Sequence, residues 1–296
     1  MLWNAIADLA WEMRSEPLNL IDTHQHLIHR SLFRYSWTKA VPALSIGEFT
    51  LETYRKLSAG TISKSIFMET GVDDPDYQNE ARFVAQLIEN QICGLVGQIA
   101  SCRPELDEGF EAWLEDSASL SVLGYRRILH TERDELSRTT TFRRNLRRIG
   151  ARKKTFDMCF QARQLPLAYE LAGACSNMTL VLDHCGVPNI ADGEFAQWAK
   201  EMKSLSRLEH VVCKLSGLLA YCAPGTANLT TIRPYIEHVL ECFGPSRIMW
   251  GSDWPVVNLG GGLLDWLNIT QEVFNLLSKD EAAMIAHQTA EKVYGI

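Results

Sequence analysis

Short apolar runs and longer amphipathic stretches alternate along almost the whole chain. Each apolar run ends in polar or small residues and is followed by a turn and then by a stretch with helical periodicity. Because strands that alternate with helices favour parallel β-α-β units, and eight such units can close on themselves, the pattern predicts an α/β fold of the distorted (β/α)8 TIM-barrel type. The eight predicted strands are Leu20–His26, Lys64–Glu69, Cys93–Ile99, Val122–Leu129, Thr155–Gln161, Leu180–His184, His210–Ser216 and Arg247–Asp253.

Three helices can be delimited from the sequence. Asp74-Pro75 predicts an N-cap followed by a first-turn proline, and the helix after it carries apolar residues at helical spacing up to Ile88. A second helix is predicted to open at Pro234 and to stop at Gly244-Pro245. A third is expected over Asp280–Tyr294.

Residues 1–19 precede the first strand and also carry apolar residues at helical spacing. We expect them to form an extra N-terminal helix that plugs or flanks the barrel. No linker rich in Ser, Gly or Pro interrupts the chain, so a single domain over residues 1–296 is expected.

Composition narrows the possible partners. The formal net charge of −7 argues against a broad nucleic-acid footprint, and no apolar run approaches the roughly 20 residues that span a bilayer. Asp8, Glu12 and Glu16 interrupt any secretory signal, and the eight cysteines show no Cys-x-x-Cys spacing. We therefore expect a cytoplasmic protein with free thiols and a small-molecule substrate; the oligomeric state is not specified.

The polar residues at the strand ends form the candidate site, because catalytic groups in such barrels come from the carboxyl ends of the strands. Asp22, His24 and His26 alternate along the first strand, which predicts that all three point into the barrel mouth. Asp183 and His184 end the sixth strand; since adjacent residues face opposite ways, we expect His184 to point inward and Asp183 to be a structural partner.

The last strand and the remaining strand ends complete the site. Asp253 follows Gly251 and Ser252, where the backbone has room to turn, and is expected to face the same cavity as the two histidines of the first strand. The expected substrate-binding residues are Glu69, Arg126, Arg127, Gln161 and Lys214. Arg126 and Arg127 are adjacent on one strand, so only one of them is expected to reach the pocket.

Three motifs resemble the amidohydrolase superfamily. They are Ile21-Asp22-Thr23-His24-Gln25-His26, Leu182-Asp183-His184-Cys185-Gly186 and Gly251-Ser252-Asp253-Trp254-Pro255. More narrowly, the chain is similar to the amidohydrolase 2 branch, which includes 2-pyrone-4,6-dicarboxylate lactonase and L-fuconolactonase-type sugar-acid lactonases. The resemblance implies a distorted barrel and a hydrolase that opens a lactone in carbohydrate or dicarboxylate metabolism. Two positions depart from the lactonase pattern. Glu69 stands where glutamine is common, and Val187 stands where lysine is common.

The resemblance does not decide whether the protein requires a metal ion. Two-metal members carry a bridging carboxylate on strand 4 and a histidine on strand 5, where this chain offers Arg126 and Arg127, and Asp157 and Gln161. A single zinc ion could be held by His24, His26, His184 and Asp253, whose side chains are suitable ligands. Since some similar lactonases work without metal, we expect either no required cofactor or one divalent metal.

A mechanism follows from these residues. Asp253 is expected to act as general base on water, while His24, His26 and His184 stabilise the developing oxyanion directly or through a metal. A zinc-dependent decarboxylase of a hydroxy-aromatic acid is an alternative, against which the missing strand 5 histidine argues. Lactone isomerisation in the same pocket is another, and a barrel that only binds its ligand is the non-enzymatic alternative.

Overall fold

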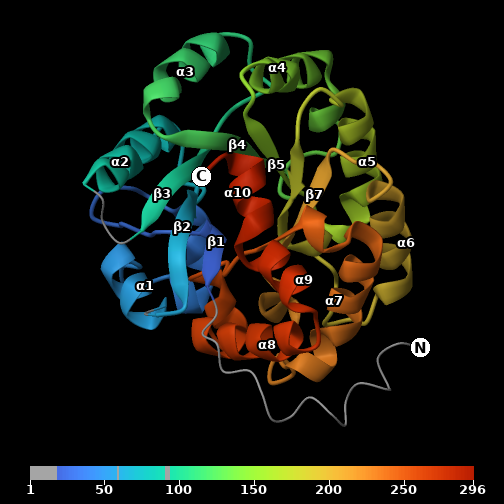
Figure 1. Cartoon of the computed structure of the whole chain (residues 1–296). Helices are drawn as coiled ribbons and strands as arrows, with labels where there is room; N and C mark the ends of the chain where they lie inside the picture. The colour runs from blue at the N-terminus through green and yellow to red at the C-terminus, as the bar shows by residue number, and fades with distance from the viewer. Residues whose placement is uncertain (1–18, 59, 91–93) are drawn as a thin grey trace.

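Eight parallel strands form the centre of the molecule. The computed structural model describes residues 19–58, 60–90 and 94–296. Its strands pair in chain order within one sheet, and most of the helices surround them (Figure 1). The strands are β1 (Leu20–Gln25), β2 (Ile62–Met68), β3 (Leu95–Ser101), β4 (Val122–Ile128), β5 (Thr155–Cys159), β6 (Leu180–Leu182), β7 (Val211–Leu215) and β8 (Ile248–Trp250).

The helices follow the strands as β-α-β units require, which confirms the predicted barrel class. They are α1 (Leu51–Ser58), α2 (Tyr77–Glu89), α3 (Phe110–Asp116), α4 (Thr140–Ala151), α5 (Leu165–Ala174), α6 (Phe195–Leu205), α7 (Leu229–Phe243), α8 (Leu263–Asn275), α9 (Lys279–Ala283) and α10 (Thr289–Tyr294). Their apolar faces pack on the outside of the sheet; Trp113, Trp198 and Trp266 are among the fully buried side chains there.

The barrel closes through the segment that follows β8 rather than through a regular ladder. The Asp253 N–H donates to the His24 carbonyl at 2.8 Å, and the His26 N–H donates to the Trp254 carbonyl at 2.8 Å. Between this segment and β1, the described part of the chain has one parallel bridge, from Gln25 to Trp254, in place of a ladder. The same hydrogen bonds that complete the distorted barrel therefore also fix Asp253 beside the two histidines of β1.

The lower half of the barrel interior is apolar. Its residues form one buried cluster that includes Ala290 and Tyr294 of α10, and Figure 1 shows α10 across this end of the barrel. The helix predicted to plug or flank the barrel, over residues 1–19, lies outside the described residues except for its last position. The cluster is completed by Ile21, Ile66, Met68, Ile99, Val181, Val212 and Met249.

Helix boundaries show where local signals mislead. Helix α2 begins at Tyr77 after Asp76, so the predicted N-cap at Asp74 is wrong; its carboxylate binds Arg103 instead. Helix α7 begins at Leu229 because the Asn228 side chain accepts a hydrogen bond from the Thr231 N–H, which places Pro234 inside the helix rather than at its start. The predicted stop at Gly244 is confirmed.

The last predicted helix is present but not uniform. Helix α9 begins at Lys279, one π-helical turn spans Met284–Gln288, and α10 continues to Tyr294. The predicted third strand included Cys93, which lies outside the described residues. The seven described cysteines are free thiols, and none of the described helices is long and apolar enough to cross a membrane.

Candidate active site

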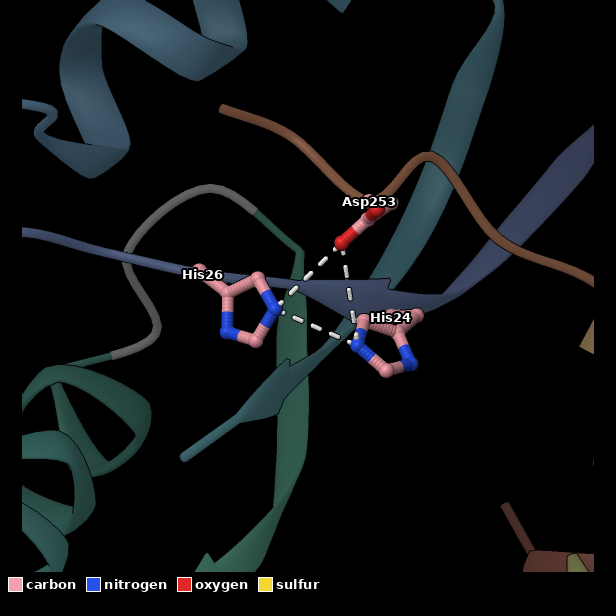
Figure 2. Close-up of side chains that lie close together, drawn as sticks. All are labelled: His24, His26 and Asp253. Carbon is pink, nitrogen blue, oxygen red and sulfur yellow. Dashed lines mark hydrogen bonds and ion pairs between the residues drawn. The ribbon is translucent and has the colours of Figure 1, made fainter. Parts of the chain in front are cut away.

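Three side chains from the first and last strands of the sheet meet at the end of the barrel where the strands have their carboxyl ends, which is its upper mouth. His24 Nε2 and His26 Nε2 are 3.2 Å apart, and Asp253 Oδ1 lies 3.9 Å from the first and 3.5 Å from the second (Figure 2). All three residues are buried. Both imidazoles therefore lie on one side of the mouth, as predicted, with His24 in β1 and His26 directly after it, and the turn after β8 brings the carboxylate to them.

Each histidine of β1 is held through its other ring nitrogen. His26 Nδ1 lies 3.0 Å from the Met68 carbonyl oxygen, and His24 Nδ1 lies 3.3 Å from Asp183 Oδ1. Because a carbonyl and a carboxylate can only accept, we assign the ring proton to Nδ1 in both rings. Burial lowers the pKa of His24 well below its usual value, so its Nε2 faces His26 and Asp253 without a proton.

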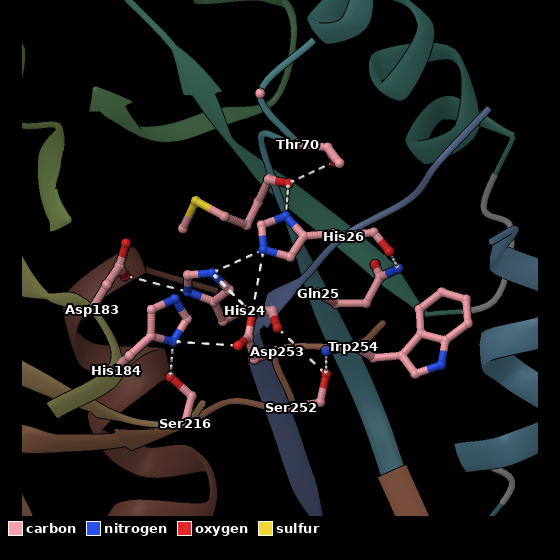
Figure 3. Close-up of polar contacts among 12 residues, drawn as sticks. His24, Gln25, His26, Thr70, Asp183, His184, Ser216, Ser252, Asp253 and Trp254 are labelled. Atoms are coloured by element: carbon pink, nitrogen blue, oxygen red, sulfur yellow. Dashed lines mark hydrogen bonds and ion pairs between the residues drawn. The ribbon is translucent and has the colours of Figure 1, made fainter. Parts of the chain in front are cut away.

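His184 approaches the same carboxylate from β6. Its Nδ1 lies 3.0 Å from Ser216 Oγ and 3.8 Å from Asp253 Oδ2 (Figure 3). A Cβ at Gly217 would lie 2.8 Å from His184 Nδ1, so this close approach requires glycine. Burial lowers the pKa of His184, which favours a neutral ring.

The backbone leaves the strand geometry where it presents these groups. His184 and Asp253 have φ angles of 52° and 56°, in the left-handed region that residues other than glycine seldom adopt. β6 ends at Leu182 and β8 at Trp250, earlier than predicted. Residues beyond the last ladder hydrogen bond are free to turn into the mouth, which the alternation rule does not anticipate.

This freedom corrects two predictions about aspartates. Asp183 faces inward as well as His184, so the expectation that only one of the two would do so is wrong. Its carboxylate lies within 3.5 Å of Lys214 Nζ and near His24, which are contacts of the structural partner that was expected. Asp22 does not join the pair on β1: it accepts hydrogen bonds from the Ser252 N–H and the Tyr54 hydroxyl. The register of β1 against β2 shifts between Asp22 and Gln25, which interrupts the alternation there.

A layer of ion pairs lies directly beneath the histidines. Lys214 Nζ is in close contact with Asp157 Oδ2 and lies 3.4 Å from His24 Nδ1; the lysine is fully buried. Burial opposes ionisation of Asp183, but Lys214 and His24 hold its pKa well below the usual range. Burial raises the pKa of Asp157 to about 7 in spite of Lys214. The predicted substrate-binding residue Lys214 therefore sits below the cavity, not in its wall.

Of the other predicted substrate-binding residues, Glu69 and both arginines reach the cavity. Arg126 Nε donates to Glu69 Oε1 at 2.7 Å, and Arg126 Nη1 lies 3.3 Å from Asp183 Oδ2. Arg127 extends along the rim to Glu105 and Glu132. Both arginines line the cavity, so the prediction that only one would do so is wrong: alternation fixes where Cβ points, not where the end of a long arginine side chain lies.

Gln161 lies apart from the histidines. It lines a separate hollow of about 410 Å³ between the loops that follow β5 and β6, where its Oε1 accepts a hydrogen bond from Arg163 Nε. Tyr221 lines both this hollow and the main cavity. The strand that was predicted to contain Gln161 ends at Cys159, so alternation no longer directs the Gln161 side chain into the barrel.

The main cavity has a volume of about 500 Å³ and opens above Asp253. Its wall includes residues that sequence reasoning missed: Trp37, Arg103, His130 and Tyr221. His130 lies two residues after the end of β4, with Nδ1 3.0 Å from Cys159 Sγ. Extending each predicted strand end by one or two residues would have found it.

The donor set at the mouth fits one divalent metal ion. His24, His26 and Asp253 each offer one ligand atom within 4.8 Å of the others, and a tetrahedral zinc ion with bonds of about 2.0–2.2 Å separates its ligand atoms by roughly 3.4 Å. Asp253 Oδ2 is buried and has no hydrogen-bond partner among the described residues. His184 groups instead with His24 and Asp183, so the predicted fourth ligand does not belong to this trio.

Comparison with known proteins agrees with this architecture. The sequence profile of the amidohydrolase family matches residues 21–296. The chain belongs to the amidohydrolase family. An L-fucono-1,5-lactonase of Burkholderia multivorans is 27% identical over 291 residues, covering 93% of this chain and 96% of that protein. A 2-pyrone-4,6-dicarboxylate hydrolase of Comamonas testosteroni is 31% identical over 108 residues, 34% of this chain and 35% of that protein.

Solved structures of the family share the barrel. A crystal structure of an amidohydrolase from Burkholderia multivorans with bound zinc superposes with a TM-score of 0.85 at 24% identity, covering 94% of this chain and 99% of the other. A 2,6-dihydroxybenzoate decarboxylase from Rhizobium superposes with a TM-score of 0.62 at 11% identity, over 94% and 99% of the two chains. At these identities the likeness is one of fold.

Proposed function

We propose that this member of the amidohydrolase family is a hydrolase that opens a lactone, with Asp253 as the base that activates water. One observation carries the proposal: Asp253 Oδ2 is buried, has no hydrogen-bond partner among the described residues, and borders the cavity beside three histidines. A buried carboxylate oxygen without a partner is costly unless a ligand or water supplies one. The relatives that act on lactones support this choice of substrate.

The reaction divides into two proton transfers at Asp253. In the first, a water oxygen bonds to the lactone carbonyl carbon while its proton passes to the carboxylate, and the carbonyl π electrons move onto oxygen. In the second, the tetrahedral intermediate re-forms the carbonyl, the bond from carbon to the ring oxygen breaks, and Asp253 returns the proton to that leaving oxygen. The products are a hydroxy acid and the regenerated carboxylate.

The oxyanion needs nearby positive or hydrogen-bonding groups. Arg126 Nη1 lies 3.4 Å from His24 Nε2, so a fixed guanidinium stands next to the imidazoles that face the reacting centre. Lys214 adds a second fixed cation 3.4 Å from the other nitrogen of the same ring. Such preorganised charge stabilises a developing anion without reorganisation during the reaction.

A metal ion would be held by His24, His26 and Asp253. When bound, it would polarise the carbonyl or lower the pKa of water. In this proposal the hydrolysis does not depend on it, because Asp253 itself accepts the water proton.

Two alternatives differ from this proposal, one in the groups that it requires and one in its use of water. No histidine lies on β5, whose sequence is TFDMC, so the strand 5 ligand of the zinc-dependent decarboxylases has no counterpart. Lactone isomerisation would use the same base but would consume no water. Incorporation of solvent oxygen into the product separates isomerisation from hydrolysis.

The test is a panel of aldono-1,4-lactones, aldono-1,5-lactones and 2-pyrone-4,6-dicarboxylate, with acid release followed by a pH indicator. We expect acid release on at least one lactone and one ¹⁸O atom in its carboxylate when the reaction runs in H₂¹⁸O. The matched control is Asp253→Asn protein at the same concentration. Absence of acid release above that control on every lactone would contradict the proposal.

A further inference from the structure

We propose that the cavity selects an uncharged, hydroxyl-bearing lactone and rejects lactones that carry carboxylate groups. This inference rests on the proposed function and narrows its substrate. The relatives act on both kinds of molecule by name, so their names alone do not decide between them. What decides is whether the cavity holds a cation that is available to a substrate.

The deepest guanidinium is already saturated by carboxylates. Arg126 donates to Glu69 Oε1 through Nε and to the Glu69 carbonyl through Nη2 at 2.6 Å, and it lies 3.3 Å from Asp183 Oδ2. Its side chain is only 4% exposed. Binding a substrate carboxylate there would require one of these buried partners to be displaced, and a buried carboxylate stripped of its cation is strongly destabilising.

The two guanidinium groups nearer the rim are paired as well. Arg103 Nη2 lies 2.7 Å from Asp74 Oδ1, and Arg127 Nη2 lies 2.8 Å from Glu105 and 3.0 Å from Glu132. Arg103 and Arg127 are 13% and 16% exposed. These pairs are more accessible than the Arg126 pair, but they still leave no unpaired guanidinium in the described wall.

The positively and negatively charged residues of the cavity wall are equal in number. Its lining residues include three cations, Arg103, Arg126 and Arg127, and an equal number of carboxylates, Glu69, Asp74 and Asp253. Lys214, the other candidate cation, is buried beneath the wall against Asp157 and Asp183. A dianionic lactone would lose its hydration on entry without gaining a compensating charge, which disfavours its binding.

Uncharged hydrogen-bonding groups supply the alternative. Burial raises the pKa of the Cys159 thiol, so the thiol keeps its proton and can donate it to His130 Nδ1. His130 then carries its own proton on Nε2 and offers a neutral donor on a residue that lines the cavity. Thr131 and Tyr221, which carry hydroxyl groups, line it too, and such groups match the hydroxyls of a sugar-derived lactone.

Binding of two unreactive probes tests this independently of turnover. Calorimetry on the full chain would compare an aldonolactam, as the uncharged probe, with pyridine-2,4-dicarboxylate, as the anionic probe. We expect the lactam to bind at least about tenfold more tightly, a difference of about 1.4 kcal/mol. Tighter binding of the dicarboxylate, or binding of neither probe, would overturn the inference. A protein that binds the lactam yet opens no lactone would contradict the proposed function alone.

A charge-release variant tests the reason for the selectivity. Asp74→Asn removes the carboxylate from Arg103 and leaves it with the neutral partners Ser101 and Cys102. We expect its affinity for pyridine-2,4-dicarboxylate to rise by about tenfold, the effect of one freed charge. The matched control is Asp107→Asn, which breaks a surface pair with Arg144 outside the cavity wall and should leave both affinities unchanged. No gain in Asp74→Asn would also overturn the inference.

Discussion

Two layers in the upper barrel are both polar and both buried, yet they differ in how completely their groups are satisfied. In the lower layer, Lys214 and Arg126 each contact carboxylates, and Asp183 lies between them. In the upper layer, two imidazole nitrogens face one another beside Asp253, whose Oδ2 has no described partner. The lower layer is therefore suited to hold its neighbours in place, while the upper layer leaves hydrogen-bonding positions open for water, a substrate or a metal. Figure 3 shows the histidines and Asp253 of the upper layer, with Asp183 beside His24.

This difference separates effects on turnover from effects on folding. A change in the upper layer should reduce turnover and leave stability nearly unchanged, since its groups make few bonds to the rest of the protein. A change in the lower layer should reduce stability, because it leaves a buried charge without its partner.

The largest effect is expected for Asp253→Asn. The amide keeps the shape of the side chain but cannot accept the water proton, so kcat should fall by about 10²–10⁴-fold. Urea unfolding should give a free energy close to that of the unmodified protein. Near-normal turnover by a preparation shown to be fully folded would refute Asp253 as the base.

Lys214→Met tests the lower layer. Methionine fills much of the same volume but leaves Asp157 and Asp183 without the ammonium between them. We expect the free energy of unfolding to fall by about 3–5 kcal/mol, the usual cost of breaking a buried pair. The measurement is urea denaturation at pH 7.

The control for this variant is Lys56→Met, which removes an ammonium from an exposed pair with Glu52 on α1. It should show no measurable change in stability, because exposed pairs of this kind contribute little. Equal stability of the two variants would mean that the lower layer does not hold the site together.

The same contrast explains what the sequence could reveal. Periodicity predicted the strands and the barrel because apolar faces must be buried whichever side chains are chosen, and it placed His24 and His26 on one face. It failed at Asp22, Asp183 and Arg127, where the chain leaves the ladder or where alternation does not fix the end of a long side chain. Alternation describes a residue inside a strand, whereas these residues lie at register shifts and strand ends.

The ion-pair partners of the buried side chains could not be predicted from the sequence either. Lys214 was predicted to bind the substrate because it lies on a strand near the mouth. Only the structure shows that its ammonium pairs with Asp157 on another strand. His130 was missed because the predicted strand stopped one residue before it. Ion pairs between distant strands depend on which side chains meet across the barrel, and a single sequence does not specify those distances.

A pH dependence of stability should arise from His130 in the cavity wall. Burial, together with Arg126, lowers its pKa to about 4 in the folded protein, below the usual 6.5. The unfolded chain therefore takes up the proton first as the pH falls, so the stabilisation is complete above pH 6.5 and is lost between there and about pH 4.

His130→Gln removes this titration. Between pH 6 and pH 4.5, the unfolding free energy of the variant should fall less steeply than that of the unmodified protein, by up to about 1.4 kcal/mol per pH unit for one proton. Urea titrations at several pH values measure the two slopes. Parallel slopes would show that His130 is protonated equally in the folded and unfolded states.

The smallest effect is expected from removing metal. The trio of His24, His26 and Asp253 fits a divalent ion, and a preparation exposed to zinc should bind it there, but occupancy alone does not establish a catalytic role. Asp253 can accept the water proton without a metal, and Arg126 and Lys214 keep two positive charges 3.4 Å from the nitrogens of His24. We therefore expect turnover on the best lactone to stay within about twofold after exhaustive chelation, since this fixed charge persists when the ion is removed. Metal content must be measured on the same sample, with Asp253→Asn protein as the inactive reference. Activity that disappears on chelation and returns with added zinc would make the ion part of the catalytic upper layer, and zinc-assisted hydrolysis would replace the metal-independent mechanism.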